Sequence, residues 1–287
     1  MHSQLPLSIM KLPKSEEQIL PIWGNSRVVQ SSKMLGGYHK IEIYSPQLLE
    51  KAKPGQFIML SPPDGQQRKM ILPRPMAIHR KHEDRGTFEV IFKKVGVGTA
   101  QLAQTQRDEN IYVIGPLGNG FHIPASTNGI LLIGRGIGIC SIAPVAQEAQ
   151  KLNIDVTALL SSRADSECVG LGDFQEFEAE ILKVSDDTFS SEIYNVEKLL
   201  SDRFSIRKPD AIMVCGSNRL IELASRLGAL WGVGVQASLE AHMACGLGYC
   251  HGCSLGLVNN GKGEGLLVCS DGPIFEVEQS LPVPMHS

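Results

Sequence analysis

The chain has 287 residues, of which 43% are hydrophobic and 20% are charged, and its formal net charge is −3. These values are typical of a globular protein with two or three domains, each large enough to bury a core. The charge is nearly balanced and no basic stripe suggests nucleic acid, and no run approaches the roughly 18 apolar residues of a membrane span. The N-terminus lacks the pattern of a signal peptide. We therefore expect a cytoplasmic protein, in which clustered cysteines bind metal more often than they form disulfides.

Residues 1–24 contain three prolines and no clear periodicity. They predict an N-terminal extension, either a disordered leader or an arm that docks onto a partner. Residues 25–125 contain short strand-like segments separated by turn signals, such as "YHKIEIYS" and "GTFEVIFKKV". This pattern indicates a small antiparallel β-barrel, with one short helix after "GVGT".

Residues 126–235 alternate between strand and helix patterns. The segments "GILLIG", "IDVTALLSSR" and "AIMVCGS" predict buried strands, whereas "FQEFEAEILKV" and "NRLIELASRLGALW" predict helices. Alternation of this kind indicates an α/β domain with a parallel sheet and right-handed crossovers. From residue 236 to residue 287 the glycine and cysteine content rises and regular patterning ends, which predicts a third, small module.

The third module holds four of the seven cysteines, in the pattern C-x4-C-x2-C-x15-C: Cys245, Cys250, Cys253 and Cys269. This is the spacing of plant-type [2Fe–2S] proteins. Three thiolates on one tight loop can wrap a small cluster, and intervening glycines let backbone N–H groups approach the sulfurs. A zinc site, which usually needs two C-x2-C pairs, and a set of buried structural thiols remain alternatives.

Two further stretches favour anionic ligands. Gly134, Gly136 and Gly138 follow a buried strand and precede a helix, a turn that brings helix N–H groups close to a phosphate. Their spacing departs from the G-x-G-x-x-G fingerprint, so a tight turn without a ligand is the alternative.

In the predicted barrel, Arg74 of "ILPRPMAIHR" is a fixed cation suited to a pyrophosphate, and Gly98 and Thr99 start a helix as a second anion site. Taken singly, these motifs also fit a surface arginine and a helix cap. The basic run from His79 to His82 is unusual, and we expect it to form a solvated loop.

The order of these motifs resembles the ferredoxin-reductase superfamily, and within it the electron-transfer subunits of heteromeric, NAD-dependent dihydroorotate dehydrogenase. The resemblance extends from about residue 26 to about residue 279. It rests on the blocks "RPMAI", "GVGTAQL", "VIGPLGNGF", "IGRGIGI", "VCGS", "SLEAHMACGLGYCHGCSLGL" and "VCSDGPIF", of which the last two are the most specific.

The resemblance implies an FAD-binding barrel, an NAD(H)-binding α/β domain and a C-terminal [2Fe–2S] module. It implies that FAD lies against one set of residues: Arg74, Pro75, Met76, Ala77, Ile91, Phe92, Lys93, Gly98 and Thr99. It implies that the nicotinamide lies near a second set: Gly134, Gly136, Gly138, Cys215 and Gly216. The four module cysteines would ligate the cluster.

The implied function is electron transfer between NAD(H) and a catalytic flavoprotein subunit containing FMN, in a 2+2 heterotetramer of pyrimidine biosynthesis. No residue of this chain is expected to act as an acid, base or nucleophile. Three positions depart from the family pattern: Ala77 replaces a serine or threonine, Arg135 a small residue, and Ser141 a proline. Two other functions therefore stay open: an electron-transfer subunit of another NAD(P)H-dependent oxidoreductase, such as a hydrogenase or a bifurcating complex, and a non-catalytic flavin- or nucleotide-binding sensor.

Overall fold

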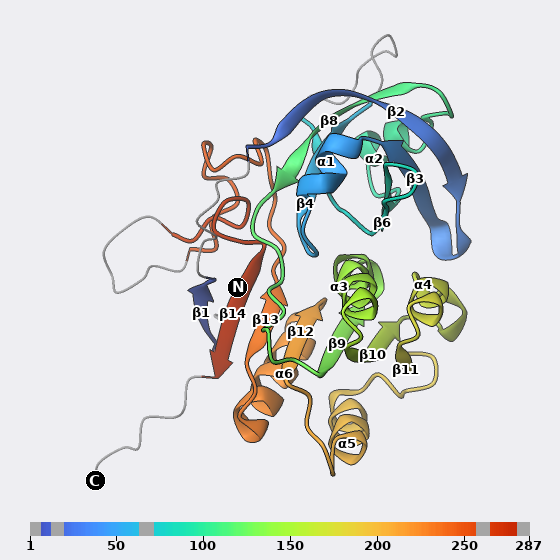
Figure 1. Cartoon of the computed structure of the whole chain (residues 1–287). Coiled ribbons are helices and arrows are strands. Elements are labelled where there is room, and N and C mark those ends of the chain that lie inside the picture. The colour runs from blue at the N-terminus through green and yellow to red at the C-terminus, as the bar shows by residue number, and fades with distance from the viewer. Residues whose placement is uncertain (1–6, 13–19, 63–71, 257–264, 280–287) are drawn as a thin grey trace.

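The computed structural model describes residues 7–12, 20–62, 72–256 and 265–279. Two seven-stranded sheets form separate layers (Figure 1). Parts of the predicted N-terminal extension (residues 1–6 and 13–19) and of the predicted C-terminal module (residues 257–264 and 280–287) lie outside the described residues. The domain boundaries expected from the sequence therefore stay predictions.

The first sheet is antiparallel, with the strand order β5-β4-β8-β2-β3-β7-β6. Strand alternation builds its core: Ile41 and Ile43 of β3 lie opposite Val90 and Phe88 of β7, and all four side chains are fully buried. The elements of this half of the chain are β2 (Ile22–Lys33), η1 (Leu35–Gly37), β3 (Tyr38–Tyr44), α1 (Pro46–Lys51), β4 (Phe57–Ser61), β5 (Arg74–Ala77), β6 (Arg80–His82), β7 (Thr87–Lys93), α2 (Val97–Leu102) and β8 (Asn110–Leu117).

The second sheet has the order β1-β14-β13-β12-β9-β10-β11, and β9 to β13 are parallel. Two antiparallel strands, β14 and β1, extend one edge. Its elements are β1 (Leu7–Lys11), β9 (Gly129–Arg135), η2 (Gly136–Gly138), α3 (Ile139–Lys151), β10 (Asp155–Ser162), η3 (Asp165–Glu167), α4 (Leu171–Glu176), β11 (Glu180–Ser185), α5 (Ile193–Arg203), β12 (Ala211–Cys215), α6 (Asn218–Trp231), β13 (Val235–Ser238) and β14 (Ile274–Gln279).

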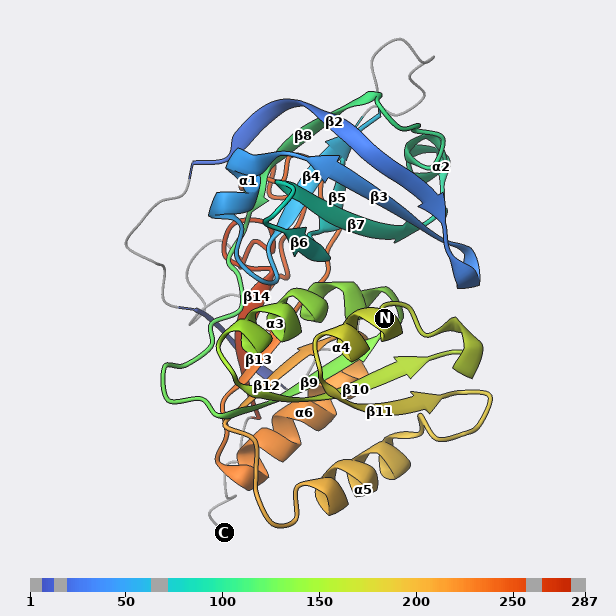
Figure 2. The ribbon, with the colours of Figure 1, turned by 45° about the vertical axis from the view of Figure 1, so that its right-hand side comes forward.

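Helices cover both faces of this sheet. Along β9, Ile130 and Leu132 pack in the cluster that contains α3, whereas Leu131 and Ile133 pack in the cluster that contains α6. Helices α3 and α4 lie between the two sheets, and α5 and α6 lie on the far side (Figure 2). No helix among the described residues is long and apolar enough to cross a membrane.

The expected combination of an antiparallel barrel-like sheet and a parallel α/β sheet is confirmed. One element was predicted wrongly: "FQEFEAEILKV" is not one helix, because α4 ends at Glu176 and Glu180–Ser185 forms β11. Parallel pairing of β11 with β10 overrides the local helical pattern. In addition, Leu7–Lys11, within the predicted extension, forms β1 and pairs with β14.

The chain reverses its direction across the second sheet at β9. From β9 the chain proceeds through β10 to β11 on one side, and then returns to β12 and β13 on the other. Ligands of such sheets bind at the carboxyl ends of the strands beside this reversal. The carboxyl ends of β9 and β12 carry Arg135 and Cys215, so this edge is the expected site.

Candidate functional site

A cavity of about 1170 Å³ lies between the two sheets, at the carboxyl ends of β9, β12 and β13. Ligand pockets typically measure about 300–1,000 Å³, so this cavity can hold more than one small ligand. Its walls include most of the predicted site residues: Arg74, Pro75, Met76, Ala77, Ile91, Phe92, Lys93, Thr99, Gly136, Gly138 and Gly216. Gly98, Gly134 and Cys215 are not among the residues that line it.

The barrel supplies one wall through β5 and β7. The Arg74 guanidinium donates hydrogen bonds to the carbonyl oxygens of Leu72 (2.8 Å) and Pro73 (3.5 Å). These partners orient the side chain without neutralising it, so its charge can serve an anionic ligand. On β7, Lys93 Nζ lies 4.5 Å from the centre of the Tyr38 ring, and both residues line the cavity.

Thr99 fixes the loop before α2. Its Oγ1 accepts hydrogen bonds from the backbone N–H groups of Val95 (2.9 Å) and Gly96 (3.2 Å) and donates one to the Gly96 carbonyl oxygen. The hydroxyl therefore shapes the cavity wall by capping this short helix. That Thr99 also contacts a pyrophosphate remains a prediction.

The glycine turn after β9 makes the opposite wall. A Cβ atom on Gly138 would lie 2.7 Å from the backbone oxygen of Cys215, so only glycine lets the turn approach the end of β12. Gly134 packs instead against Ile139 and Ile142 of α3, where a Cβ would come within 2.9 Å and 2.7 Å of their side chains. The predicted glycines thus divide into cavity-lining and packing positions.

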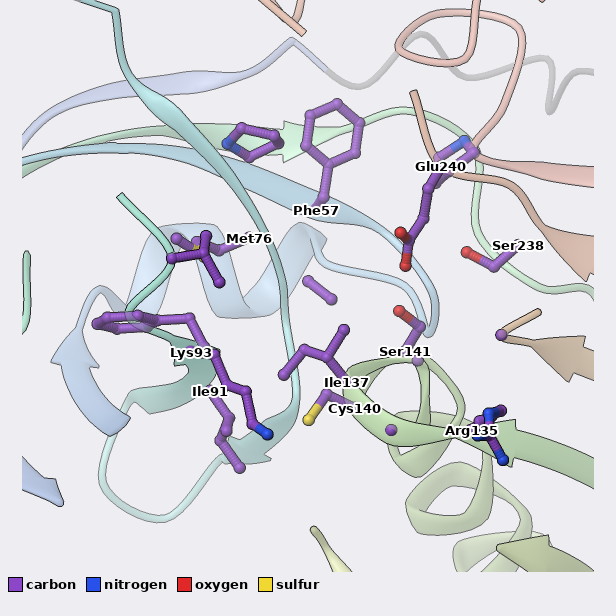
Figure 3. Close-up of a pocket in the computed structure, with 18 of the residues that line it drawn as sticks. Phe57, Met76, Ile91, Lys93, Arg135, Ile137, Cys140, Ser141, Ser238 and Glu240 are labelled. Atoms are coloured by element: carbon purple, nitrogen blue, oxygen red, sulfur yellow. The ribbon is translucent and has the colours of Figure 1, made fainter. Parts of the chain in front are cut away.

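Arg135, which departs from the family pattern, is held by neighbouring strands. Its guanidinium donates two hydrogen bonds to Asp186 (3.1 and 2.7 Å) and one to Ser161 Oγ (2.7 Å). The Arg135 charge and a hydrogen bond from Ser191 lower the pKa of Asp186 to about 2. The ion pair neutralises the charge of Arg135 at the cavity edge. Figure 3 shows the Arg135 side chain apart from the other labelled side chains.

Three polar residues line the cavity near the ends of β13 and α3, and none of them was a predicted site residue: Ser141, Ser238 and Glu240. Their oxygens gather in one part of the cavity in Figure 3. Burial raises the pKa of the neighbouring Cys215 thiol to about 12, even though Ser141 and Ser238 form hydrogen bonds with it. Because Ser238 ends a parallel strand beside β12, the carboxyl-end rule could have identified this group. Ala77 lines the barrel side without a hydroxyl.

The four predicted cluster ligands form two pairs. Cys253 Sγ lies 3.1 Å from Cys269 Sγ, and Cys245 Sγ accepts a hydrogen bond from the Cys250 backbone N–H (3.5 Å) and interacts with the Cys250 thiol. Among the described residues, no three cysteine sulfurs lie within 4.8 Å of one another. A single tetrahedral zinc with Zn–S bonds of about 2.3 Å would gather all four sulfurs more closely. Two pairs of thiols are the arrangement that two iron atoms require.

Backbone N–H groups point at these sulfurs. Gly248 donates to Cys269 Sγ (3.1 Å), Leu247 donates to Cys245 Sγ (3.4 Å), and Cys269 donates to Cys253 Sγ (3.4 Å). Burial alone would raise the pKa of Cys245, but the backbone donors outweigh it and lower that pKa to about 7. Donors aimed at thiolates are the surroundings of an iron–sulfur cluster, so the residues present fit this group.

Comparisons with known proteins bear on the cluster-binding region and on the fold. Residues 240–280 match the family described as the iron–sulfur cluster binding domain of dihydroorotate dehydrogenase B. In fold, the chain is similar to an NADH-dependent reduced ferredoxin–NADP oxidoreductase, with a TM-score of 0.71 at 23% identity over 92% of both chains. Phthalate dioxygenase reductase gives a TM-score of 0.63 at 13% identity, over 86% of this chain and 94% of that one. The fold is thus ferredoxin-reductase-like, and its C-terminal region matches an iron–sulfur cluster binding family.

The relatives in sequence are more specific. The electron transfer subunit of dihydroorotate dehydrogenase B from Desulforamulus reducens is 29% identical over 82% of this chain and 89% of its own length. The corresponding subunit from Enterococcus faecalis is 27% identical over 88% and 95%. A homolog of this subunit from Thermotoga maritima is 26% identical over 88% and 86%. Over most of its length the chain is thus similar to the electron transfer subunits of dihydroorotate dehydrogenase B, which confirms the resemblance found in the sequence.

Proposed function

We propose that the protein carries electrons between NAD(H) and the catalytic subunit of a dihydroorotate dehydrogenase, through FAD and a [2Fe–2S] cluster. One observation supports this proposal above the others. The cluster loop, residues 245–253, packs against β4, the strand that pairs with β5 in the cavity wall proposed to hold FAD. A Cβ atom on Gly246 would lie 2.7 Å from Met59 Cγ, and Met59 of β4 pairs with Pro75 of β5. Glu240 and Met243, just before Cys245, line the cavity itself. The two sites are therefore in direct structural contact.

On the barrel side, the proposed role of Arg74 is to hold the pyrophosphate of FAD, while Pro75, Met76 and Ala77 pack along the ring system. Ile91, Phe92 and Lys93 extend the same wall. A bound flavin supplies the exchange between the two-electron chemistry of a pyridine nucleotide and the one-electron chemistry of an iron–sulfur cluster. The chain's residues orient the ring and exclude water from it.

On the opposite wall, the glycine turn and Gly216 leave room for a nicotinamide against the barrel side. Ser141, Ser238 and Glu240 supply hydrogen-bonding groups there. We assign the cluster ligands as Cys245 with Cys250 on one iron, and Cys253 with Cys269 on the other. This assignment follows the two sulfur pairs.

The relatives are named as subunits, so we propose that a catalytic flavoprotein subunit containing FMN binds this chain, in a 2+2 complex. The cluster loop presents Tyr249, which is 91% exposed, and Leu247, which is 48% exposed, beside the exposed Cys250. Exposed apolar side chains beside an electron-transfer site suit a partner that covers them.

The test is an anaerobic native purification of this chain, followed by an assay of dihydroorotate-dependent NAD⁺ reduction on the purified complex. Co-purification of an FMN protein, with NADH formed from NAD⁺ and dihydroorotate, is the expected result. Co-purification of a different oxidoreductase, with no response to dihydroorotate, would assign the chain to another electron-transfer complex. A chain that binds FAD and the cluster but is not reduced by NADH or NADPH would act as a sensor.

A further inference from the structure

The basic run from His79 to His82 does not form the solvated loop that its composition suggested. Arg80–His82 is strand β6, and the His79 side chain is completely buried. The run lies at the edge of the barrel sheet, where β6 faces α3 and α4 of the other layer (Figure 2). Burying polar and charged groups is unfavourable unless they are paired, so the partners of this run identify its role.

One carboxylate of α4 binds two side chains of the run. His79 Nε2 lies 3.0 Å from Asp173 Oδ2, and Arg80 Nη1 donates to Asp173 Oδ1 at 3.0 Å. His79 and Arg80 belong to the layer built on the first, antiparallel sheet, which we call the barrel layer. Asp173 belongs to the layer built on the second sheet, which we call the nucleotide layer. Each contact therefore crosses the interface between the two layers.

Arg80 continues this network along α4. Its guanidinium forms a two-bond pair with Glu176, with Nη1 2.7 Å from Oε2, and lies 5.0 Å from the centre of the Phe177 ring. The Arg80 side chain is only 16% exposed. A planar fork paired with a carboxylate and stacked on a ring fixes both orientation and distance.

A third contact joins the run to α3. The Lys81 backbone N–H donates to Gln147 Oε1 (3.0 Å), and Gln147 Nε2 donates to the Lys81 carbonyl oxygen (2.6 Å). The amide thus continues the hydrogen bonding of an edge strand into a helix of the other layer. We call these contacts, made by His79, Arg80 and Lys81 with Asp173, Glu176 and Gln147, the β6 clasp.

The β6 clasp connects the elements that carry the two walls of the cavity. Strand β6 pairs with β7, which continues to the cavity-lining residues Ile91–Lys93. Helix α3 begins directly after the glycine turn, and Cys140 and Ser141 in its first turn line the cavity from the other side. The Cys140 thiol also interacts electrostatically with the buried His79 imidazole.

We propose that Arg80 and His79 are positioning residues. Through Asp173 they set the distance between the cavity wall proposed for FAD, on β5 and β7, and the wall proposed for the nicotinamide, at the glycine turn and the start of α3. They do so without touching either ligand. This inference rests on the proposed function only in so far as a hydride passes between the two walls. Reacting atoms must come within about 3–3.5 Å for such a transfer, and a misplacement of about 1 Å can reduce the rate about 100-fold.

The test compares Arg80→Met with a matched control, Arg203→Met. Arg203 also forms a two-bond pair with a carboxylate, Glu180, and stacks on Phe204 at 5.1 Å, but all three residues belong to the nucleotide layer. FAD-bearing proteins are mixed anaerobically with saturating NADH, and bleaching of the flavin is followed. We expect Arg80→Met to lower the limiting rate at least about tenfold while the Kd for NAD⁺ changes less than about twofold. Arg80→Lys should recover part of the rate, and Arg203→Met should keep it within about twofold.

A second measurement does not depend on activity. Cys140 is 1% exposed, so alkylation of this residue by iodoacetamide reports separation of the layers. We expect mass spectrometry to find at least about fivefold faster alkylation of Cys140 in Arg80→Met than in wild type or Arg203→Met. A folded Arg80→Met protein with unchanged limiting rate and unchanged Cys140 protection would overturn the inference.

If Arg80→Met does not fold, Glu176→Gln removes only the exposed end of the clasp, and the same two readouts decide. If NADH fails to reduce even the wild-type flavin, the proposed function is wrong. The alkylation result then still decides whether the clasp holds the layers together.

Discussion

Gly246 of the cluster loop packs against Met59 of β4 so closely that a Cβ atom would lie 2.7 Å from Cγ and 2.9 Å from Sδ of the methionine. The glycine also has a φ angle of +71°, which disfavours any other residue. This contact ties the iron–sulfur module to the barrel, on the strand next to the proposed flavin wall. It gives the first prediction.

Gly246→Ala should displace the cluster loop from the barrel, because the new methyl group collides with Met59 and because alanine adopts this positive φ angle only with strain. We expect a loss of about 2–4 kcal/mol in the free energy of unfolding and a lower iron content. The control is Gly256→Ala, with a φ angle of +67° but no atom within 4 Å of the added Cβ. Equal effects of the two substitutions on unfolding and iron content would show that strain alone is responsible.

The second prediction concerns the cluster ligands. Cys253→Ser should abolish the cluster, since it removes one member of the pair with Cys269. FAD should stay bound, because the cavity walls do not include Cys253. Metal and sulfide analysis with absorption spectroscopy checks both points, with Cys168→Ser as a control outside the module. Stoichiometric zinc in place of iron in the anaerobically purified wild type would refute the assignment.

Arg74 provides the third prediction. Arg74→Met should weaken FAD binding about 10- to 100-fold, the effect of losing a charge-assisted hydrogen bond of about 1.5–3 kcal/mol. Isothermal titration of the flavin-free protein with FAD measures the Kd. Arg107→Met removes a largely exposed arginine elsewhere on the barrel and should leave the Kd unchanged. A Kd within twofold of wild type for Arg74→Met would exclude Arg74 from the flavin site.

The fourth prediction is a dependence of stability on pH. Burial disfavours the charged form of His79, but the Cys140 thiol and Asp173 outweigh burial and raise its pKa from 6.5 to about 10. The folded protein therefore holds this proton more tightly than the unfolded chain does. Its contribution to stability is complete below pH 6.5 and is lost as the pH rises from 6.5 through about 10.

Chemical unfolding of the wild type and of His79→Gln at pH 6.5 and pH 10 measures this contribution. The wild type should lose on the order of a few kcal/mol more between the two values than the variant does. The variant should already be less stable at pH 6.5, because it leaves Asp173 without its imidazolium partner. Parallel losses in both proteins would show that His79 carries no extra proton in the folded state.

Much of the fold could be predicted from local patterns. The buried strand "GILLIG" and the helix "NRLIELASRLGALW" became β9 and α6, because their apolar residues match the period of a strand and of a helix. The cysteine spacing predicted four cluster ligands, which the structure places in two pairs. In these cases the information lies within one short segment.

The features that could not be predicted depend on contacts between segments that lie far apart in the sequence. His79 is buried because Asp173, 94 positions later, meets its imidazole, and no local pattern signals that pair. The prediction of a helix over β11 is wrong because the residues of β11 alone give no signal of its pairing with β10. The sequence alone does not identify Glu240 as a cavity residue because "SLEAH" has no distinctive spacing, although Glu240 lies just beyond Ser238, the last residue of β13.

The proposed function requires electrons to pass within this chain from the cavity to the cluster loop, which packs on the barrel through Gly246 and Met59. The most direct test is anaerobic rapid mixing of the purified chain with NADH, followed by optical and electron paramagnetic resonance spectroscopy. We expect flavin bleaching and then the signal of a reduced [2Fe–2S] cluster, and Cys253→Ser should abolish that signal without preventing the bleaching. Bleached flavin beside a fully loaded cluster that stays oxidised would contradict the proposed function.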